Sequence, residues 1–126
     1  MIAVIDRDRL TAYGLALLLR DWGYESVVGT SAEDIFGRTE ARGRPLAGIV
    51  ADDRMEDGST GEDEAAALSA LAARAIPTVV LVSAYSPVGR PQGGAGKGEA
   101  GMAHISKPIE PFKLRDLLQT MIRTSP

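Results

Sequence analysis

Residues 47–55 read Ala47-Gly48-Ile49-Val50-Ala51-Asp52-Asp53-Arg54-Met55, a short apolar run that ends abruptly in charged residues. An apolar run of this length without polar alternation is typical of a strand buried on both faces of a parallel sheet. Turn-forming residues follow at 57–61, and the Ala-rich stretch 62–75 has the composition of a helix. The segment therefore predicts a strand, a loop and a helix in that order.

The same alternation of short apolar runs and helical patterns continues on both sides of this segment. The predicted strands are Ile2–Ile5, Ser26–Val28, Ala47–Ala51, Thr78–Val82 and Ala103–Ser106. A helix after the first strand would bury Leu10, Gly14, Leu17, Leu18 and Trp22, and a last helix opened by Pro111 would bury Phe112, Leu114, Leu117, Leu118, Met121 and Ile122. Parallel strands need crossover connections, which place helices on both faces of the sheet. We therefore predict an α/β fold with a doubly wound five-stranded parallel sheet.

Length and composition narrow the class of protein. With 126 residues the chain has the length of one domain, so we expect a single domain over residues 1–126. It has no cysteine and one histidine, which excludes disulfides, a thiolate nucleophile and Cys- or His-rich metal centres. A net charge of -3 gives no electrostatic footprint for nucleic acid or an anionic membrane. No apolar run has the length of a membrane span or the pattern of a signal peptide, so we expect a cytoplasmic domain.

Polar residues follow four of the predicted strands at the point where each strand ends. They are Asp6 and Asp8, then Asp52 and Asp53, then Ser83, and finally Lys107. Ligands of such sheets bind beyond the carboxyl ends of the strands, so we expect these side chains to converge. A nucleophilic carboxylate, further acids for a hard cation, a hydroxyl and a lysine suit transfer of a phosphoryl group to an aspartate. Alternatively the acids are solvated loop residues, a reading that their placement at neighbouring strand ends disfavours.

With these residues in place, the sequence resembles the receiver domain of two-component response regulators, the flavodoxin-like fold of the chemotaxis protein CheY. The resemblance covers nearly the whole chain. It rests on Ile5-Asp6, residues 49–55, Ser83-Ala84, and Lys107-Pro108 with the amphipathic helix behind them. Residues 51–55, with the loop 57–61, are most similar to receivers at the C-terminal end of hybrid sensor histidine kinases.

The resemblance implies a role for each of these residues. Asp52 is the expected phosphoacceptor, and Asp6, Asp52 and the backbone carbonyl of Arg54 are the expected Mg²⁺ ligands, with Asp8 as a further candidate. Ser83 and Lys107 are expected to contact the phosphoryl group and to relay phosphorylation to the last strand and helix. The donor would be a histidine kinase or a phosphotransfer protein. Such a domain catalyses its own modification and is not a turnover enzyme.

Three departures from the family pattern change these expectations. Arg7 stands where the family has its second metal-binding acid, which would weaken Mg²⁺ binding. Asp8 could turn in as a ligand, or Arg7 could pair with Asp52 and supply positive charge in place of part of the metal's role. His104 stands at the position of a switch aromatic residue, where it either rotates and adds pH sensitivity or has no special role. Residues 85–102 are too rich in Gly and Pro for the family's fourth helix, so we expect a loop there, with one turn near residues 99–102.

Two other functions remain open. Arg7 and the missing helix are compatible with a degenerate receiver that serves as a phosphorylation-independent docking module. A more distant alternative is a small α/β enzyme that uses the same acids for metal-assisted hydrolysis.

Overall fold

The computed structural model describes residues 1–54, 59–82, 96–97 and 102–124. Their strands are β1 (Ile2–Ile5), β2 (Ser26–Gly29), β3 (Gly48–Asp52), β4 (Thr78–Val82), β5 (Gly96–Lys97) and β6 (Met102–Ser106). Their helices are α1 (Arg9–Asp21), α2 (Ala32–Arg42), α3 (Gly61–Ala72) and α4 (Pro111–Thr124). The sheet has the order β2-β1-β3-β4-β6-β5, in which the first five strands are parallel. The predicted doubly wound five-stranded parallel sheet is therefore confirmed.

The short strand β5 was not expected from the sequence. Its two residues pair antiparallel with β6, and Gly96 lies opposite His104. They belong to the Gly-rich stretch 85–102, for which we predicted a loop in place of a helix. Residues 83–95 and 98–101 lie outside the described residues, so the loss of the helix and the turn near Glu99 stay predictions. Met102, however, already belongs to β6.

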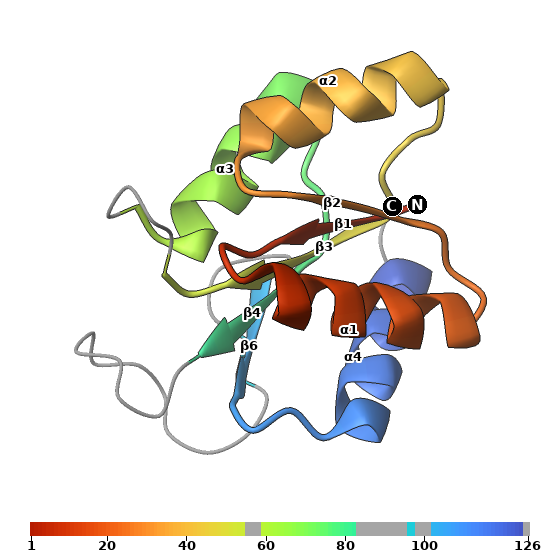
Figure 1. Cartoon of the computed structure of the whole chain (residues 1–126), viewed down its shortest axis with the longest axis vertical. Coiled ribbons are helices and arrows are strands. Elements are labelled where there is room, and N and C mark those ends of the chain that lie inside the picture. Colours follow the sequence, from red (N-terminus) through yellow and green to blue (C-terminus); the bar gives the residue numbers. More distant parts are fainter. Residues whose placement is uncertain (55–58, 83–95, 98–101, 125–126) are drawn as a thin grey trace.

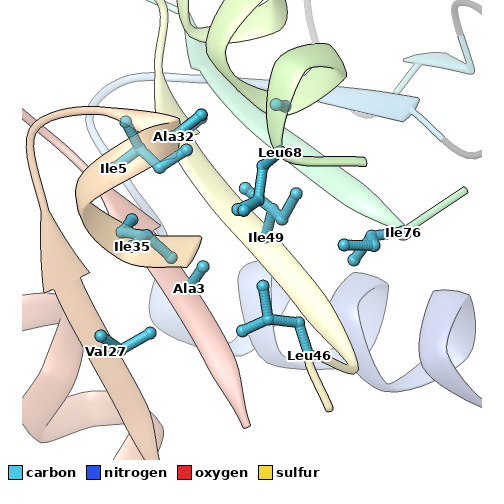
Figure 2. Close-up of a cluster of buried hydrophobic side chains, with 11 residues drawn as sticks. Ala3, Ile5, Val27, Ala32, Ile35, Leu46, Ile49, Leu68 and Ile76 are labelled. Carbon is cyan, nitrogen blue, oxygen red and sulfur yellow. The ribbon is translucent and has the colours of Figure 1, made fainter. Parts of the chain in front are cut away.

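Helices cover both faces of the sheet, with α2 and α3 on one side and α1 and α4 on the other (Figure 1). Alternate residues of the strands belong to two separate hydrophobic cores, one on each face of the sheet. The core below α2 and α3 (Figure 2) contains Ala3, Ile5, Val27, Ala32, Ile35, Leu46, Ile49, Ala51, Ala65, Leu68 and Ile76. The core below α1 and α4 contains Ile2, Val4, Ala12, Leu15, Leu19, Val50, Val79, Leu81, Ile105, Leu114 and Leu118. Because each fully buried aliphatic side chain contributes about 1.5–3 kcal/mol, these two clusters hold the strand ends in a fixed arrangement.

The buried face of α1 differs from the predicted one. Leu10 and Leu17 are 84% and 64% exposed, while Ala12, Leu15 and Leu19 are buried. Both sets have helical spacing, because α1 is apolar on two sides, so periodicity alone could not select the inner face. No helix in the described part of the chain is long and apolar enough to cross a membrane.

The prediction for Phe112 was wrong. It is 67% exposed in the first turn of α4, whose buried residues Leu114 and Leu118 face the sheet. The guanidinium carbon of Arg115 lies 4.9 Å from the centroid of the Phe112 ring. This cation–π contact covers part of the Phe112 ring, which lies outside the hydrophobic core.

Candidate functional site

The ends of β3 and β6 bring a carboxylate and an amine together. Asp52 is the last residue of β3, and Lys107 follows the last residue of β6. Lys107 Nζ donates to Asp52 Oδ1 over 2.6 Å, and the side chains are 34% and 7% exposed, respectively. A charge-assisted hydrogen bond to a carboxylate that is largely removed from water is stronger than a surface ion pair. Lys107 therefore fixes one of the two carboxylate oxygens of Asp52.

A second buried acid, Asp6, lies directly after β1 and is 3% exposed. Its Oδ1 accepts a hydrogen bond from the backbone N–H of Asp8 over 2.8 Å. Its Oδ2 is buried without a hydrogen-bond partner among the described residues. Burial raises the pKa of Asp6, and the nearby charge of Asp52 raises it further, although the Asp8 N–H acts in the opposite direction. The site thus brings two buried carboxylates, Asp6 and Asp52, close to one another, and Lys107 pairs with Asp52.

This pair of acids fits a small hard cation. Mg²⁺ takes oxygen ligands, usually from one or two carboxylates, and retains several of its waters. Asp6 Oδ2 is a buried carboxylate oxygen without a partner in the described chain, and Asp52 carries a second carboxylate close enough to affect its charge. No three acidic or histidine side chains of the described residues gather into a larger metal site. Further ligands of a bound cation from the described part of the chain would be backbone carbonyl oxygens, together with water.

Asp8 and Arg7 are placed differently from these two acids. Asp8 is the exposed N-cap of α1, where its Oδ1 accepts from the Leu10 N–H over 3.1 Å and its Oδ2 from the Thr11 hydroxyl over 2.8 Å. The Thr11 hydroxyl, and then the Leu10 N–H, lower the pKa of Asp8. Arg7 is exposed, and the cation that pairs with Asp52 is Lys107. Both oxygens of Asp8 thus serve the start of the helix.

The other predicted site residues lie in several environments. Ser83 is outside the described residues, and Arg54 is exposed just after β3. Asp53 is 2% exposed, and its N–H donates to the Leu81 carbonyl over 3.1 Å. His104 is 8% exposed within β6.

Sequence reasoning missed the partner of His104. Its Nε2 lies 3.5 Å from Oε2 of Glu62, in the first turn of α3. Glu62 is also an acid in the first turn of a helix, where its charge is favourable whatever else it contacts. The two residues are separated by 42 positions, so no local pattern could have paired them.

Comparison with known proteins identifies the architecture. No family model and no curated protein matches the sequence. A response regulator receiver protein from Sinorhizobium medicae WSM419 superposes with a TM-score of 0.72 at 16% identity, over 98% of this chain and 94% of that chain. The chain has the fold of response-regulator receiver domains.

Other solved structures share this receiver fold. A sensor protein from Polaromonas sp. JS666 gives a TM-score of 0.71 at 22% identity, over 97% of this chain and 94% of that chain. The receiver domain of the hybrid histidine kinase CckA gives a TM-score of 0.64 at 21% identity, over 96% of this chain and 97% of that one. In the receiver fold of the present chain, β1, β3 and β6 carry Asp6, Asp52 and Lys107 at their carboxyl ends.

Proposed function

We propose that the chain is a receiver domain of two-component signalling that takes a phosphoryl group on Asp52. The observation that carries this proposal is the buried Asp52 carboxylate, held by Lys107 over 2.6 Å beside the second buried acid Asp6. The donor would be a histidine kinase or a phosphotransfer protein. The receiver fold and the order of the site residues along the chain support it.

The proposed reaction transfers a phosphoryl group from a histidine to an aspartate. The Asp52 oxygen that is not bonded to Lys107 attacks phosphorus, the phosphorus–nitrogen bond of phosphohistidine breaks, and its electron pair stays on the imidazole. The product is an acyl phosphate on Asp52. Lys107 neutralises charge on the carboxylate and, after transfer, on the phosphoryl oxygens. The hydroxyl of Ser83 is proposed to donate to one of these oxygens.

Asp6, Asp52 and the backbone carbonyl of Arg54 are the proposed Mg²⁺ ligands. When bound, Mg²⁺ would supply positive charge for the transferred group. Asp6 is held ready for this by the Asp8 N–H, which occupies Oδ1 and leaves Oδ2 available. Asp8 itself would have to release its hydrogen bonds to Leu10 and Thr11 before it could bind the cation.

The signal would leave through the face next to Lys107. Lys107 connects β6 to the start of α4, so a change in its contacts acts directly on these two elements. The similarity of residues 51–61 to receivers of hybrid kinases favours a phosphorelay partner. The domain would be modified once per signal and would not turn over a substrate.

Intact-mass analysis after incubation with Mg²⁺ and acetyl phosphate tests the proposal. We expect one phosphoryl adduct that hydroxylamine removes, as it does acyl phosphates. Asp52→Asn should abolish the adduct, while Asp53→Asn, which changes the neighbouring acid, should retain it. An adduct that survives Asp52→Asn would contradict the assignment of the phosphoacceptor.

The exposed cation Arg7 favours a second candidate function. A receiver with weakened Mg²⁺ binding would act as a docking module that does not depend on phosphorylation. Arg7→Asp decides between the two, because it adds a carboxylate next to Asp6. A more than tenfold gain in Mg²⁺ affinity, measured by calorimetry, together with an adduct formed only by the variant, would favour the docking module. An adduct formed equally well by the native chain favours phosphorylation.

A further inference from the structure

The start of α3 is packed directly against the main chain of the proposed phosphoacceptor. A Cβ atom added to Gly61 would lie 1.7 Å from the carbonyl oxygen of Asp52, a distance that real atoms do not adopt. The Gly61 N–H donates to the carbonyl of Asp53 over 3.3 Å. Thr60 and Asp63 form a capping box that fixes this first turn. The backbone around Asp52 and the first turn of α3 are therefore one mechanical unit.

The next residue of α3, Glu62, extends from this unit to β6. Its Oε2 lies 3.5 Å from His104 Nε2, and the two side chains are 30% and 10% exposed, respectively. The other ring nitrogen of His104, Nδ1, is buried and has no hydrogen-bond partner within the described chain. The imidazole is thus positioned by its Glu62 contact, in surroundings with little competing water.

The Asp52–Lys107 contact starts from β3 and the Glu62–His104 contact from α3, and the two lie on opposite faces of the sheet. Val50 and Ile105 both belong to the core below α1 and α4. Since side chains alternate along a strand, Asp52 lies on the same face as Val50, and His104 lies on the face opposite Ile105. β4 separates the two strands, with Val80 paired to both Ala51 and His104. The Asp52–Lys107 pair therefore bridges β4 on one face, and Glu62–His104 bridges it on the other.

We infer that Glu62 and His104 are positioning residues for the phosphoacceptor site. The inference rests on the proposed function and names a contact that regulates the same site. A phosphoryl group on Asp52 adds charge and bulk beside Lys107, and main-chain shifts of Asp52 reach Gly61 and hence Glu62. Such a coupling is reciprocal. If phosphorylation changes the equilibrium constant for forming the Glu62–His104 contact by some factor, the contact changes the affinity of the site for a phosphoryl group by the same factor.

Beryllofluoride binding in the presence of Mg²⁺ measures this coupling without turnover of phosphate. We expect Glu62→Ala to weaken beryllofluoride affinity about three- to tenfold, and Glu62→Gln, which retains a hydrogen-bonding oxygen, to recover part of the loss. Glu33→Ala is the matched control, because Glu33 is the second residue of α2 just as Glu62 is of α3. Both substitutions remove one acid from a helix N-terminus, but only Glu62 contacts His104.

Nuclear magnetic resonance of the imidazole separates positioning from a merely structural role. The chain has one histidine, so the His104 ring signal needs no assignment. We expect beryllofluoride to shift this signal in the native chain and to shift it less in Glu62→Ala. A ring signal that does not move while the native complex forms, or equal affinities of Glu62→Ala and Glu33→Ala, would overturn the inference. If the native chain forms neither a complex nor a phosphoryl adduct, the proposed function fails and the inference fails with it.

Discussion

At the scale of single residues, Asp6 carries a charge that its buried surroundings disfavour. Burial and the charge of Asp52 raise its pKa above the ordinary value of 3.8. A raised pKa means that ionisation of Asp6 costs the folded state more than the unfolded state. This cost is absent below pH 3.8 and is complete once the pH exceeds the raised pKa. At neutral pH, Asp6 therefore lowers the stability of the metal-free domain.

Asp6→Asn should consequently stabilise the domain in metal-free buffer at neutral pH. Asparagine retains an oxygen for the Asp8 N–H but carries no charge. We expect a higher unfolding temperature than that of the native chain at pH 7, and a difference that disappears as the pH falls below the ordinary range of Asp. Thermal unfolding in chelating buffer across this pH range checks the prediction. A difference that grows toward acid pH would contradict the assigned sign.

The Asp52–Lys107 pair could be predicted from the sequence, whereas the Glu62–His104 contact could not. Parallel strands bring their carboxyl ends to one edge of the sheet, so residues after β3 and β6 meet whatever the details of packing. The contact of Glu62 depends instead on how α3 lies across β4, which the side chains of the core determine. A carboxylate in the first turn of a helix is already explained by its favourable interaction with the helix dipole. The sequence therefore gives no sign that Glu62 also contacts His104.

At the scale of elements, substitution of three helical glycines by alanine should change the stability of the domain with different signs, positive at two positions and negative at the third. Gly14 and Gly37 lie in α1 and α2, and an added Cβ would meet nothing within 4 Å. Alanine at either position should raise the free energy of unfolding by about 0.5–1 kcal/mol. Gly61→Ala should lower it by about 1–3 kcal/mol or more, because the Cβ would collide with the Asp52 carbonyl. Denaturant unfolding of the three variants checks these signs, and a stabilising Gly61→Ala would refute the close packing of α3 on β3.

The elements themselves differ in how far the sequence reveals them. Thr78–Val82 is an uninterrupted run of residues that favour strands, and β4 has the same bounds. Gly96–Lys97 has no such preference, and β5 exists because the open edge of β6 offers unpaired backbone groups. In α1, the exposed Leu10 and Leu17 repeat the spacing of the buried face. Local preference thus predicts the elements that bury apolar runs, and tertiary contacts determine the rest.

At the scale of the whole molecule, the Mg²⁺ ion and the phosphoryl group of the proposed function would connect three strand ends across the middle of the sheet. Asp6 follows β1, Asp52 ends β3 and Lys107 follows β6, and these strands lie within the order β1-β3-β4-β6. A group bound to all three residues would connect distant parts of the chain, because α1 begins soon after the β1 end and α4 soon after the β6 end. Binding should therefore stabilise the domain as one cooperative unit.

Mg²⁺ and beryllofluoride together should raise the unfolding temperature of the native chain in a single transition. A ligand that binds only the folded state stabilises it by about 2.7 kcal/mol at a hundredfold excess over its Kd, which corresponds to several degrees for a domain of this size. Asp52→Asn should lose the combined shift, and Glu33→Ala, far from the site in sequence and without a role in it, should keep it. Differential scanning calorimetry with each component alone and with both distinguishes the contributions. Equal shifts in the native chain and in Asp52→Asn would place the bound group elsewhere, because the proposed site is built on the buried Asp52 carboxylate that Lys107 holds.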